Sequence, residues 1–401
     1  MPVVRPAALP FAFTVGIAAC VTGPARLAPL APLPAVGADT VRSRFVAMGV
    51  RHEYRYHTRG PWAIHLLDID RAAGCWTLVA EKGNPTTTGR QPTSELIGEV
   101  ARVRGRQNVA GGTNADFFLF DPPGVPQGAH VQDGRVLAGP VPGRPVVVVD
   151  DTGRVSIATL SLSAEVLGPM DRWNHPARDG VALLDERYGA PTDTAAGTIV
   201  LIASLVRTAG DTLRAVVTTV DSGGPRWATR GTIVLVAGPR APLERRTALT
   251  ARHPGDTVQV IRQILPRLPR EAVGGFPVLV AASAVDPGID TAGSEGFRGR
   301  HPRTALLIAD GARRIILLTV DGRQPGYSAG MTLRELADYA LALGAHDAVN
   351  LDGGGSTTMV VRDSGEAAFR VVNRPSDKEG ERPVANALAV VQYPCAVKRG
   401  P

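Results

Sequence analysis

Three aspartates stand where apolar segments end and glycines or small polar residues begin: Asp116 in GGTNADFF, Asp321 in TVDGR and Asp352 in NLDGGGS. A carboxylate at the end of a strand can be held rigidly and still reach a cleft. Aspartate before glycine is also common in plain turns, and for Asp321 both interpretations stay open. A plain turn explains Asp352 less well, because three consecutive glycines lose much backbone entropy on folding. We therefore predict that a ligand lies close to the backbone of residues 353–355.

Two arginines bracket one predicted strand–turn–strand, Arg303 at its start and Arg323 at its end. They would therefore lie at the same end of the hairpin. Guanidinium groups bind the oxygens of phosphate or carboxylate in a bidentate manner. A salt bridge to Asp321 or Asp352 is the alternative, and it does not exclude a binding role.

The glycine run itself and one further glycine-containing stretch resemble catalytic motifs, but neither meets the requirements of its motif. GGGSTT (353–358) lacks the lysine and the following helix of a phosphate-binding Walker loop. GYSAG (326–330) has the spacing of a nucleophile elbow, but it does not come directly off a predicted strand. We interpret GYSAG as a loop.

The composition of the 401 residues excludes some classes of function. The net charge is +7, yet the basic residues are nearly all arginines scattered along the chain, with no basic run that carries interleaved aromatics. Nucleic-acid binding is therefore not predicted. The eight histidines are dispersed and no Cys/His cluster has zinc spacing.

The N-terminus predicts export. MPVVRPAALPFAFTVGIAAC has a basic start and an apolar core too short to span a membrane. It ends in IAAC, which resembles the lipobox of bacterial lipoproteins, so Cys20 could carry a lipid. An ordinary signal cleaved near Ala38 is the alternative. Either way we expect residues 1–38 to be signal and Pro/Ala-rich tether, and the protein to be periplasmic or at the cell surface. Cys75 and Cys395 could pair there or remain separate thiols.

Most of the remaining chain has the pattern of β-strands. Residues 64–70 and 75–81 are expected to form the two arms of a hairpin. Helices are expected at 93–105 and at 332–344, where Thr332 and Glu335 form a capping box. Further predicted strands are 144–150, 197–206, 212–220, 231–238 and 256–264, and 303–323 as a strand–turn–strand.

Several of these segments resemble the phosphodiester glycosidase domain family. They are NVAGGTNADFF, RHPRTALLIADG, LLTVDGRQPGYSAGMTLRELADYALALGAHDAVNLDGGGSTTMVV and VVNRPSDKEGERPVANALAVV. The resemblance covers roughly residues 40–393. It implies an α+β fold with a mostly antiparallel, strongly bent β-sheet packed with a few helices. One catalytic domain would span 39–395, and 160–290 would be a strand-rich part of it that matches only loosely.

The resemblance implies hydrolysis of a sugar, N-acetylglucosamine-like, joined through C1 to a phosphodiester, with release of the sugar and a phosphomonoester. By position, the family motif falls on Asn114, Asp116, Arg303, Thr304, Asp321, Arg323, Asn350, Asp352, Gly353, Gly354, Ser356, Asn373, Ser376, Asp377, Arg382 and Asn386. NADFF places a carboxylate where the animal members have none.

Roles follow from the chemistry of the reaction. A carboxylate stabilises or attacks an oxocarbenium-like centre, and phosphate leaves readily without a general acid. We assign Asp352 as nucleophile or base, Arg303 and Arg323 as phosphate ligands, and Asp116 and Asp321 as supporting acid/base or positioning groups. No cofactor is expected to be required, although a structural Ca²⁺ stays open.

Two other functions stay open. One is a metal-assisted phosphodiesterase whose Asp and Asn oxygens bind Ca²⁺ or Mg²⁺. The other is a non-catalytic module that binds cell-surface polysaccharide. The expected partner is a sugar-phosphate or cell-envelope glycan, with membrane contact only through a lipid on Cys20.

Overall fold

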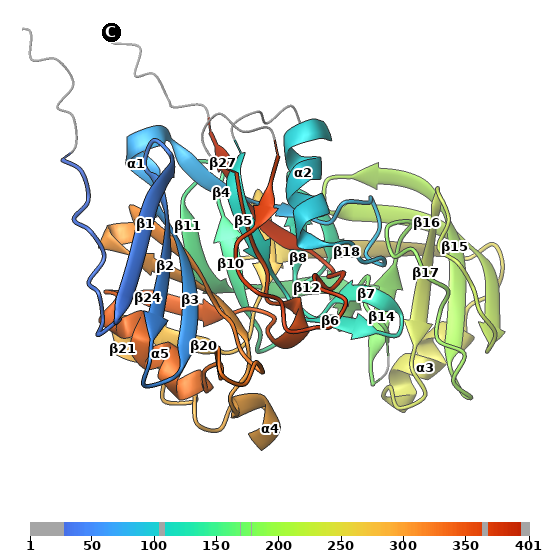
Figure 1. Cartoon of the computed structure of the whole chain (residues 1–401). Coiled ribbons are helices and arrows are strands. Elements are labelled where there is room, and N and C mark those ends of the chain that lie inside the picture. Colours follow the sequence, from blue (N-terminus) through green and yellow to red (C-terminus); the bar gives the residue numbers. More distant parts are fainter. Residues whose placement is uncertain (1–27, 104–108, 169, 178, 363–367, 394–401) are drawn as a thin grey trace, which may run out of the picture.

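The computed structural model describes residues 28–103, 109–168, 170–177, 179–362 and 368–393. Its paired strands run antiparallel, except for one short parallel pair among the described strands. Helices are few and short beside the strands (Figure 1). The predicted α+β fold with a mostly antiparallel, strongly bent sheet and a few helices is therefore confirmed.

An eight-stranded sheet forms the first layer. In spatial order its strands are β1 (Thr40–Ala47), β2 (Val50–His57), β3 (Trp62–Asp70), β23 (Arg314–Val320), β22 (Arg303–Ala309), β24 (Asp347–Asn350), β20 (Val278–Ala281) and β21 (Ala284–Val285). The 3₁₀ turn η1 (Asp310–Ala312) joins β22 to β23, and the short helix α4 (Glu295–Arg298) precedes β22. Alternate side chains of β3, β22 and β23 fill two different cores, so these central strands are apolar on both faces.

Helix α5 (Leu333–Ala342) covers one face of this sheet. Its buried residues Leu336, Ala337 and Ala340 pack with Leu307 and Leu318 of β22 and β23. The predicted capping box is present: Thr332 Oγ1 accepts from the Glu335 N–H, and the Glu335 carboxylate accepts from the Thr332 N–H.

A five-stranded sheet packs against the other face. Its strands are β26 (Arg370–Val371), β25 (Met359–Val361), β5 (Val109–Asn114), β27 (Ala387–Gln392) and β4 (Trp76–Glu81). One hydrophobic core joins both sheets, with Leu67 and Leu317 on one side and Leu78 and Leu388 on the other. Helix α2 (Thr93–Val103) covers the outer face of this second sheet.

The predicted hairpin of residues 64–70 and 75–81 is wrong. β3 and β4 lie in different sheets: β3 pairs with β2 and β23, whereas β4 pairs with β27. The intervening residues form a single helical turn, α1 (Arg71–Gly74), which ends at Cys75 in the left-handed conformation. This turn redirects the chain between the layers. Both strands are buried on both faces, so their sequence pattern could not distinguish the two arrangements.

Cys75 forms a disulfide. The N–H of Tyr393 donates to the Cys75 carbonyl at 2.7 Å, so the end of the described chain passes beside this cysteine. The other two cysteines, Cys20 and Cys395, lie outside the described residues.

Two further sheets extend the molecule. A five-stranded sheet has the order β11 (Val155–Thr159), β10 (Pro145–Val149), β19 (Glu271–Gly274), β8 (His130–Gln132), β9 (Arg135–Ala138). A seven-stranded sheet has the order β12 (Ser161–Glu165), β18 (Thr257–Leu265), β16 (Thr212–Ser222), β15 (Ile199–Ala209), β17 (Thr232–Ala237), β14 (Val181–Leu184), β13 (Arg172–Trp173), and it packs with α3 (Leu243–Thr250). The pair β6 (Phe118–Phe120) and β7 (Pro123–Pro126) completes the strands.

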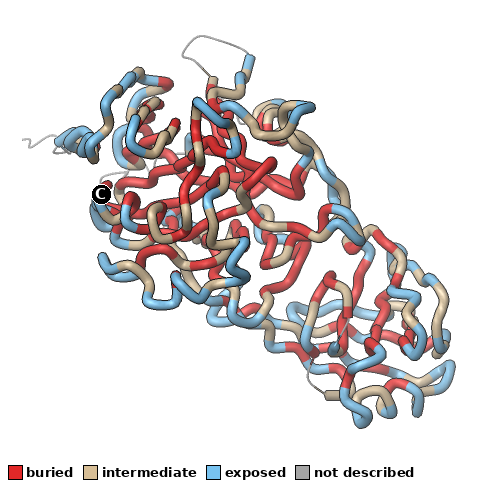
Figure 2. Tube along the Cα trace, turned by 60° about the horizontal axis from the view of Figure 1, so that its bottom comes forward, coloured by how far each residue is buried: buried red, intermediate tan, exposed pale blue. Residues whose placement is uncertain are grey.

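The seven-stranded sheet lies at the end of the molecule opposite β1–β3 (Figure 1). Buried residues run through both ends of the elongated molecule (Figure 2). All seven strands lie within residues 161–265. No helix in the described part of the chain is long and apolar enough to cross a membrane.

Candidate active site

The glycine-rich segment crosses from one sheet to the other. Asp352 follows β24 of the eight-stranded sheet, and after the turn η2 (Gly354–Ser356) the chain enters β25 of the five-stranded sheet. The Leu351 N–H donates to the Thr304 carbonyl, and the Asp352 N–H donates to the Ala115 carbonyl, both at 2.8 Å. Asp352 is therefore fixed to both sheets at the point where their strand ends meet.

Asn114 holds this crossing from the other side. Its Nδ2 donates to the Asp352 carbonyl at 2.7 Å, and its Oδ1 accepts from Thr304 Oγ1 at 2.9 Å and from the Thr358 N–H at 3.1 Å. Asn114 and Thr304 are both fully buried. The two predicted site residues therefore position the backbone around Asp352.

Asp352 is half-buried as a residue. Desolvation, and after it the negative charge of Asp116, raises its pKa to about 7. The nearby Ser356 hydroxyl, the Arg382 guanidinium and the Gly353 N–H act in the opposite direction. Asp352 and Asp116 thus lie close enough to influence each other's ionisation.

Asp116 is almost completely buried, with 1% of its surface exposed. Its Oδ2 accepts from the Gly128 N–H at 2.7 Å, and its Oδ1 pairs with Arg144 Nη2 at 3.4 Å. Burial raises the pKa of Asp116, and Arg144 opposes that rise. A Cβ at Gly274 would collide with the same carboxylate, so a glycine there leaves room for it.

Asp321 lies at the end of β23 and accepts hydrogen bonds on both oxygens. They come from Asn373 Nδ2 at 3.0 Å, the Arg374 N–H at 3.0–3.1 Å and the Tyr327 hydroxyl at 3.1 Å. Desolvation raises its pKa to about 6, against these donors. Asn373 also donates to the Thr357 carbonyl at 3.0 Å. The contacts of Asp321 and Asn373 therefore bind the NRPSD segment to the site.

Arg303 is a buried cation. Its Nε donates to the Met331 carbonyl, and its Nη2 donates to the carbonyls of Phe297 and Gly299. Desolvation, together with the charge of Arg323, lowers the pKa of Arg303 to about 10. The two guanidinium groups therefore lie close enough to repel each other, as expected for arginines at the same end of one hairpin.

Arg323 is exposed, and its guanidinium lies within 3.1 Å of His301 Nδ1. His301 Nε2 contacts the Gly296 carbonyl at 2.6 Å, which makes Nδ1 the acceptor for Arg323. Burial and the two arginines lower the pKa of His301. Among the described residues no carboxylate pairs with Arg303 or Arg323, so the predicted alternative of a salt bridge to Asp321 or Asp352 is not found.

The three glycines pack against the protein itself. A Cβ at Gly353 would lie 2.6 Å from the Pro302 carbonyl oxygen, and one at Gly354 would lie 3.2 Å from Arg323 Nη1. Gly354 also has φ +63°, which favours glycine. These contacts explain the glycine run without a ligand against its backbone.

At Gly355 a Cβ would collide with Asp377 and Arg382. These two side chains form a bidentate ion pair at 2.7 and 3.1 Å. Since Arg382 also lowers the pKa of Asp352, this pair lies at the site rather than on a remote surface.

Several buried polar atoms around the loop have no hydrogen-bond partner within the described part of the chain. They are Asn350 Oδ1, Ser376 Oγ, Gln324 Oε1 and Arg144 Nε. A buried polar group without a partner costs about 1–3 kcal/mol. A polar ligand would satisfy some of these atoms.

The sequence did not indicate Arg144, His301, Tyr327 or the phenylalanines near Asp116. Arg144 precedes an ordinary valine-rich strand and carries no motif. Its importance comes only from the fold, which brings it to within 3.4 Å of Asp116. Among the described residues no three His, Cys, Asp or Glu side chains gather as a metal site.

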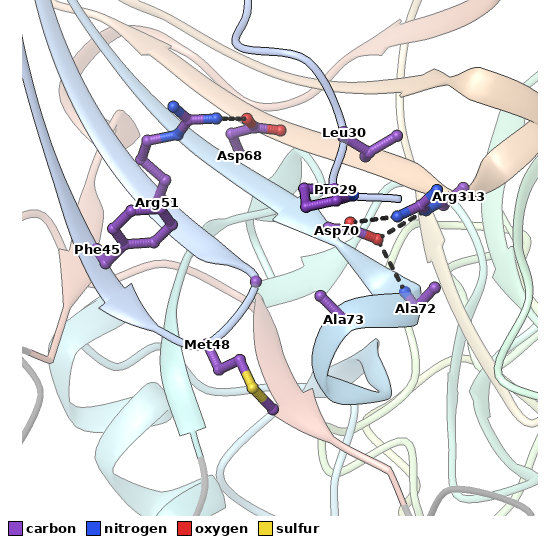
Figure 3. Close-up of a pocket in the computed structure, with 11 residues that line it drawn as sticks. Pro29, Leu30, Phe45, Met48, Arg51, Asp68, Asp70, Ala72, Ala73 and Arg313 are labelled. Atoms are coloured by element: carbon purple, nitrogen blue, oxygen red, sulfur yellow. Dashed lines mark hydrogen bonds and ion pairs between the residues drawn. The ribbon is translucent and has the colours of Figure 1, made fainter. Parts of the chain in front are cut away.

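A separate cavity of about 670 Å³ is lined by residues of β1, β2, the end of β3 and α1 (Figure 3). Asp70 pairs there with Arg313, and Asp68 with Arg51 at 3.3 Å. In the β3–β23 pair, Asp70 lies opposite Arg314 at one end, whereas Asp321 follows Val320 at the other end. The cavity is therefore not part of the site around Asp352.

Residues 213–391 match the family described as phosphodiester glycosidase, which confirms the resemblance found in the sequence. The match includes Arg303, Asp321 and Asp352, whereas Asn114 and Asp116 lie before it. No curated protein sequence matches the chain.

Two solved structures share the fold, and a third aligns more weakly. A hypothetical protein from Synechocystis aligns with a TM-score of 0.68 and 22% identity over 88% of this chain, which spans 64% of that protein's length. A candidate exported protein from Burkholderia pseudomallei K96243 aligns with a TM-score of 0.61 and 23% identity, covering 83% of this chain and 74% of that one. The catalytic domain of zebrafish N-acetylglucosamine-1-phosphodiester α-N-acetylglucosaminidase, auto-inhibited by its pro-peptide, aligns with a TM-score of 0.40 and 14% identity over 88% and 83% of the two chains.

Proposed function

We propose that this chain, whose residues 213–391 match the phosphodiester glycosidase family, is an exported hydrolase that cleaves the C1–O bond of a sugar-1-phosphodiester. The products would be the free sugar, N-acetylglucosamine-like, and a phosphomonoester. One arrangement carries the proposal: the carboxylates of Asp352 and Asp116 and the guanidinium groups of Arg303 and Arg323 all lie around the segment that crosses between the sheets.

Asp352 is the group we assign to the anomeric carbon. As a whole residue it is less buried than Asp116, and its backbone is held by Asn114 and Ala115. A rigid carboxylate can attack C1 or activate water beside it, because both routes pass through an oxocarbenium-like state. Asp116 is saturated by Gly128 and Arg144, so we assign it to tuning the charge of Asp352 rather than to direct attack.

Arg303 and Arg323 are the proposed phosphate ligands. A buried cation without a carboxylate partner is costly unless an anion joins it, and none of the described carboxylates pairs with Arg303. The developing negative charge on the leaving phosphate would be stabilised by both guanidinium groups. Asp321, with both oxygens accepting hydrogen bonds from residues 327, 373 and 374, is assigned a positioning role.

Hydrolysis of a panel of sugar-1-phosphodiesters in ¹⁸O-labelled water tests the proposal. Attack at C1 puts the label on the sugar and leaves the phosphate oxygens unchanged. Label on the phosphate would mean attack at phosphorus, as in a metal-assisted phosphodiesterase, and would overturn the assignment of Asp352. Absence of turnover with every member of the panel would favour a binding module instead.

Export is the second part of the proposal. The apolar N-terminal segment that ends at Cys20 supports it, although residues 1–27 lie outside the described part of the chain. The disulfide at Cys75 also suits an oxidising compartment. Fractionation of cells that express the parent and Cys20→Ala tests the lipid anchor. A parent already found in the soluble exported fraction would contradict lipidation, and a parent retained in the cytoplasm would contradict export.

A further inference from the structure

Three phenylalanine rings and the guanidinium group of Arg144 lie together beside the candidate active site, and we propose that they form the subsite for the sugar ring of the substrate. The inference rests on the proposed function for the identity of that substrate. Phe117 directly follows Asp116 in the chain. Phe276 exchanges two hydrogen bonds with Asn350, and the Phe297 carbonyl accepts from Arg303. Each ring is therefore tied to a different residue of the site.

The rings come from three separate segments and pack on one another. The ring centres of Phe117 and Phe297 are 5.8 Å apart, and those of Phe276 and Phe297 are 6.0 Å apart with nearly parallel planes. All three side chains are only half-buried. Aromatic residues that served the core alone would be expected to be fully buried, like Phe118 nearby.

Arg144 covers two of these rings. Its guanidinium carbon lies 5.6 Å from the ring centre of Phe117 and 5.5 Å from that of Phe276. Its Nη2 pairs with Asp116 and its Nη1 donates to Gln127 Oε1, both at 3.4 Å, whereas its buried Nε has no partner among the described residues. This buried N–H donor lacks a partner, and an oxygen acceptor placed beside the rings would satisfy it.

The occupant must present an apolar face to the rings and an oxygen acceptor to Arg144. A pyranose ring has both, since one face consists of C–H groups and its substituents carry oxygen. Asp116 already balances the charge of Arg144, so a second carboxylate would be repelled by Asp116 and Asp352. We therefore infer a neutral sugar whose hydroxyl or amide carbonyl accepts from Arg144 Nε.

Ligand-observed NMR titration of the full chain can test this subsite without any turnover. The probes are methyl N-acetyl-α-glucosaminide and, separately, inorganic phosphate. Phe276→Leu keeps an apolar side chain and removes the ring, so the Kd of the glycoside should rise roughly fivefold. The Kd of phosphate should change less than about twofold, because the ring contacts of Phe276 among the described residues are with Arg144 and Phe297. Phe45→Leu, on the exposed edge strand β1, is the matched control and should change neither value.

Arg144→Lys is the second variant. Lysine retains the charge beside Asp116 and loses the guanidinium N–H, so glycoside binding should again weaken while phosphate binding holds. A parent that does not bind the glycoside, or variants that bind it as tightly as the parent, would overturn the subsite. Equal losses for glycoside and phosphate would also overturn it, because they would indicate a structural role. A parent that binds the glycoside but hydrolyses no phosphodiester would leave the subsite standing and refute the proposed reaction.

Discussion

Asn114 donates a hydrogen bond to the backbone carbonyl of Asp352 at 2.7 Å, although the two residues are separated by 238 positions in the chain. The same amide accepts from Thr304 and from the Thr358 N–H. One side chain thus joins the ends of strands from both sheets to the backbone of the proposed nucleophile. Both the oxygen and the nitrogen of this buried amide have hydrogen-bond partners. A buried polar group that is fully satisfied in this way can fix the position of its neighbours.

Removal of this amide should displace Asp352. We expect Asn114→Ala to reduce kcat far more than it raises KM, since the displaced group acts in the chemical step. The free energy of unfolding should fall by about 2–3 kcal/mol, because buried partners are left without hydrogen bonds. Steady-state kinetics and thermal unfolding of the same preparation measure the two effects. If kcat falls only in proportion to the fraction of folded protein, Asn114 stabilises the fold and does not position Asp352 for the reaction.

Asp352→Asn should abolish turnover and leave the fold intact. The substitution removes the charge and hardly changes the volume. Asp338→Asn, on the exposed side of α5, is the control and should retain parental kcat/KM. The same panel of sugar-1-phosphodiesters serves as substrate. Near-parental activity in Asp352→Asn would contradict the assignment of this carboxylate to the reaction.

The pH dependence follows from the raised pKa of Asp352. A carboxylate that must be ionised to attack C1 becomes active as the pH passes its pKa of about 7, so kcat/KM should rise up to that pH and then level off. Activity that instead falls above pH 7 would mean that Asp352 acts in its protonated form.

The same shift affects stability. The pKa of Asp352 is higher in the folded chain than in the unfolded one, so the folded state binds the proton more tightly. Its contribution to stability is present below about pH 4 and is lost as the pH rises towards 7. Asp352→Asn should therefore raise Tm relative to the parent more at pH 8 than at pH 5. An equal difference at both pH values would show that the carboxyl group has an ordinary pKa in the folded state.

The sequence predicted the local features of the site well. The capping box at Thr332, the turn after Ala309 and the strand ends at Asp321 and Asp352 all depend on neighbouring residues and are found in the structure. These features come from short-range rules of capping, turn formation and periodicity.

What the sequence could not predict depends on pairing between distant segments. The strands at 62–70 and 76–81 are buried on both faces, so nothing in their pattern assigned them to different sheets. Arg144 precedes β10 and Asp116 follows β5, so the two residues meet only because the fold brings these segments together. The glycine run was expected to receive a ligand, yet Pro302, Arg323 and the Asp377–Arg382 pair already occupy the space that side chains would fill.

Arg323→Lys tests the phosphate ligands with the least disturbance of the fold. Arg323 is exposed and contacts His301, whereas Arg303 donates to three backbone carbonyls whose loss would also destabilise the protein. Lysine keeps the positive charge but cannot bind phosphate oxygens with a planar fork. We expect kcat/KM to fall about tenfold, which corresponds to roughly 1.4 kcal/mol of lost transition-state stabilisation. Competitive inhibition by inorganic phosphate should weaken by a similar factor. Arg334→Lys, on the exposed surface of α5, should change neither value and serves as the control. If Arg323→Lys keeps the parental kcat/KM and the parental affinity for phosphate, the phosphate binds elsewhere.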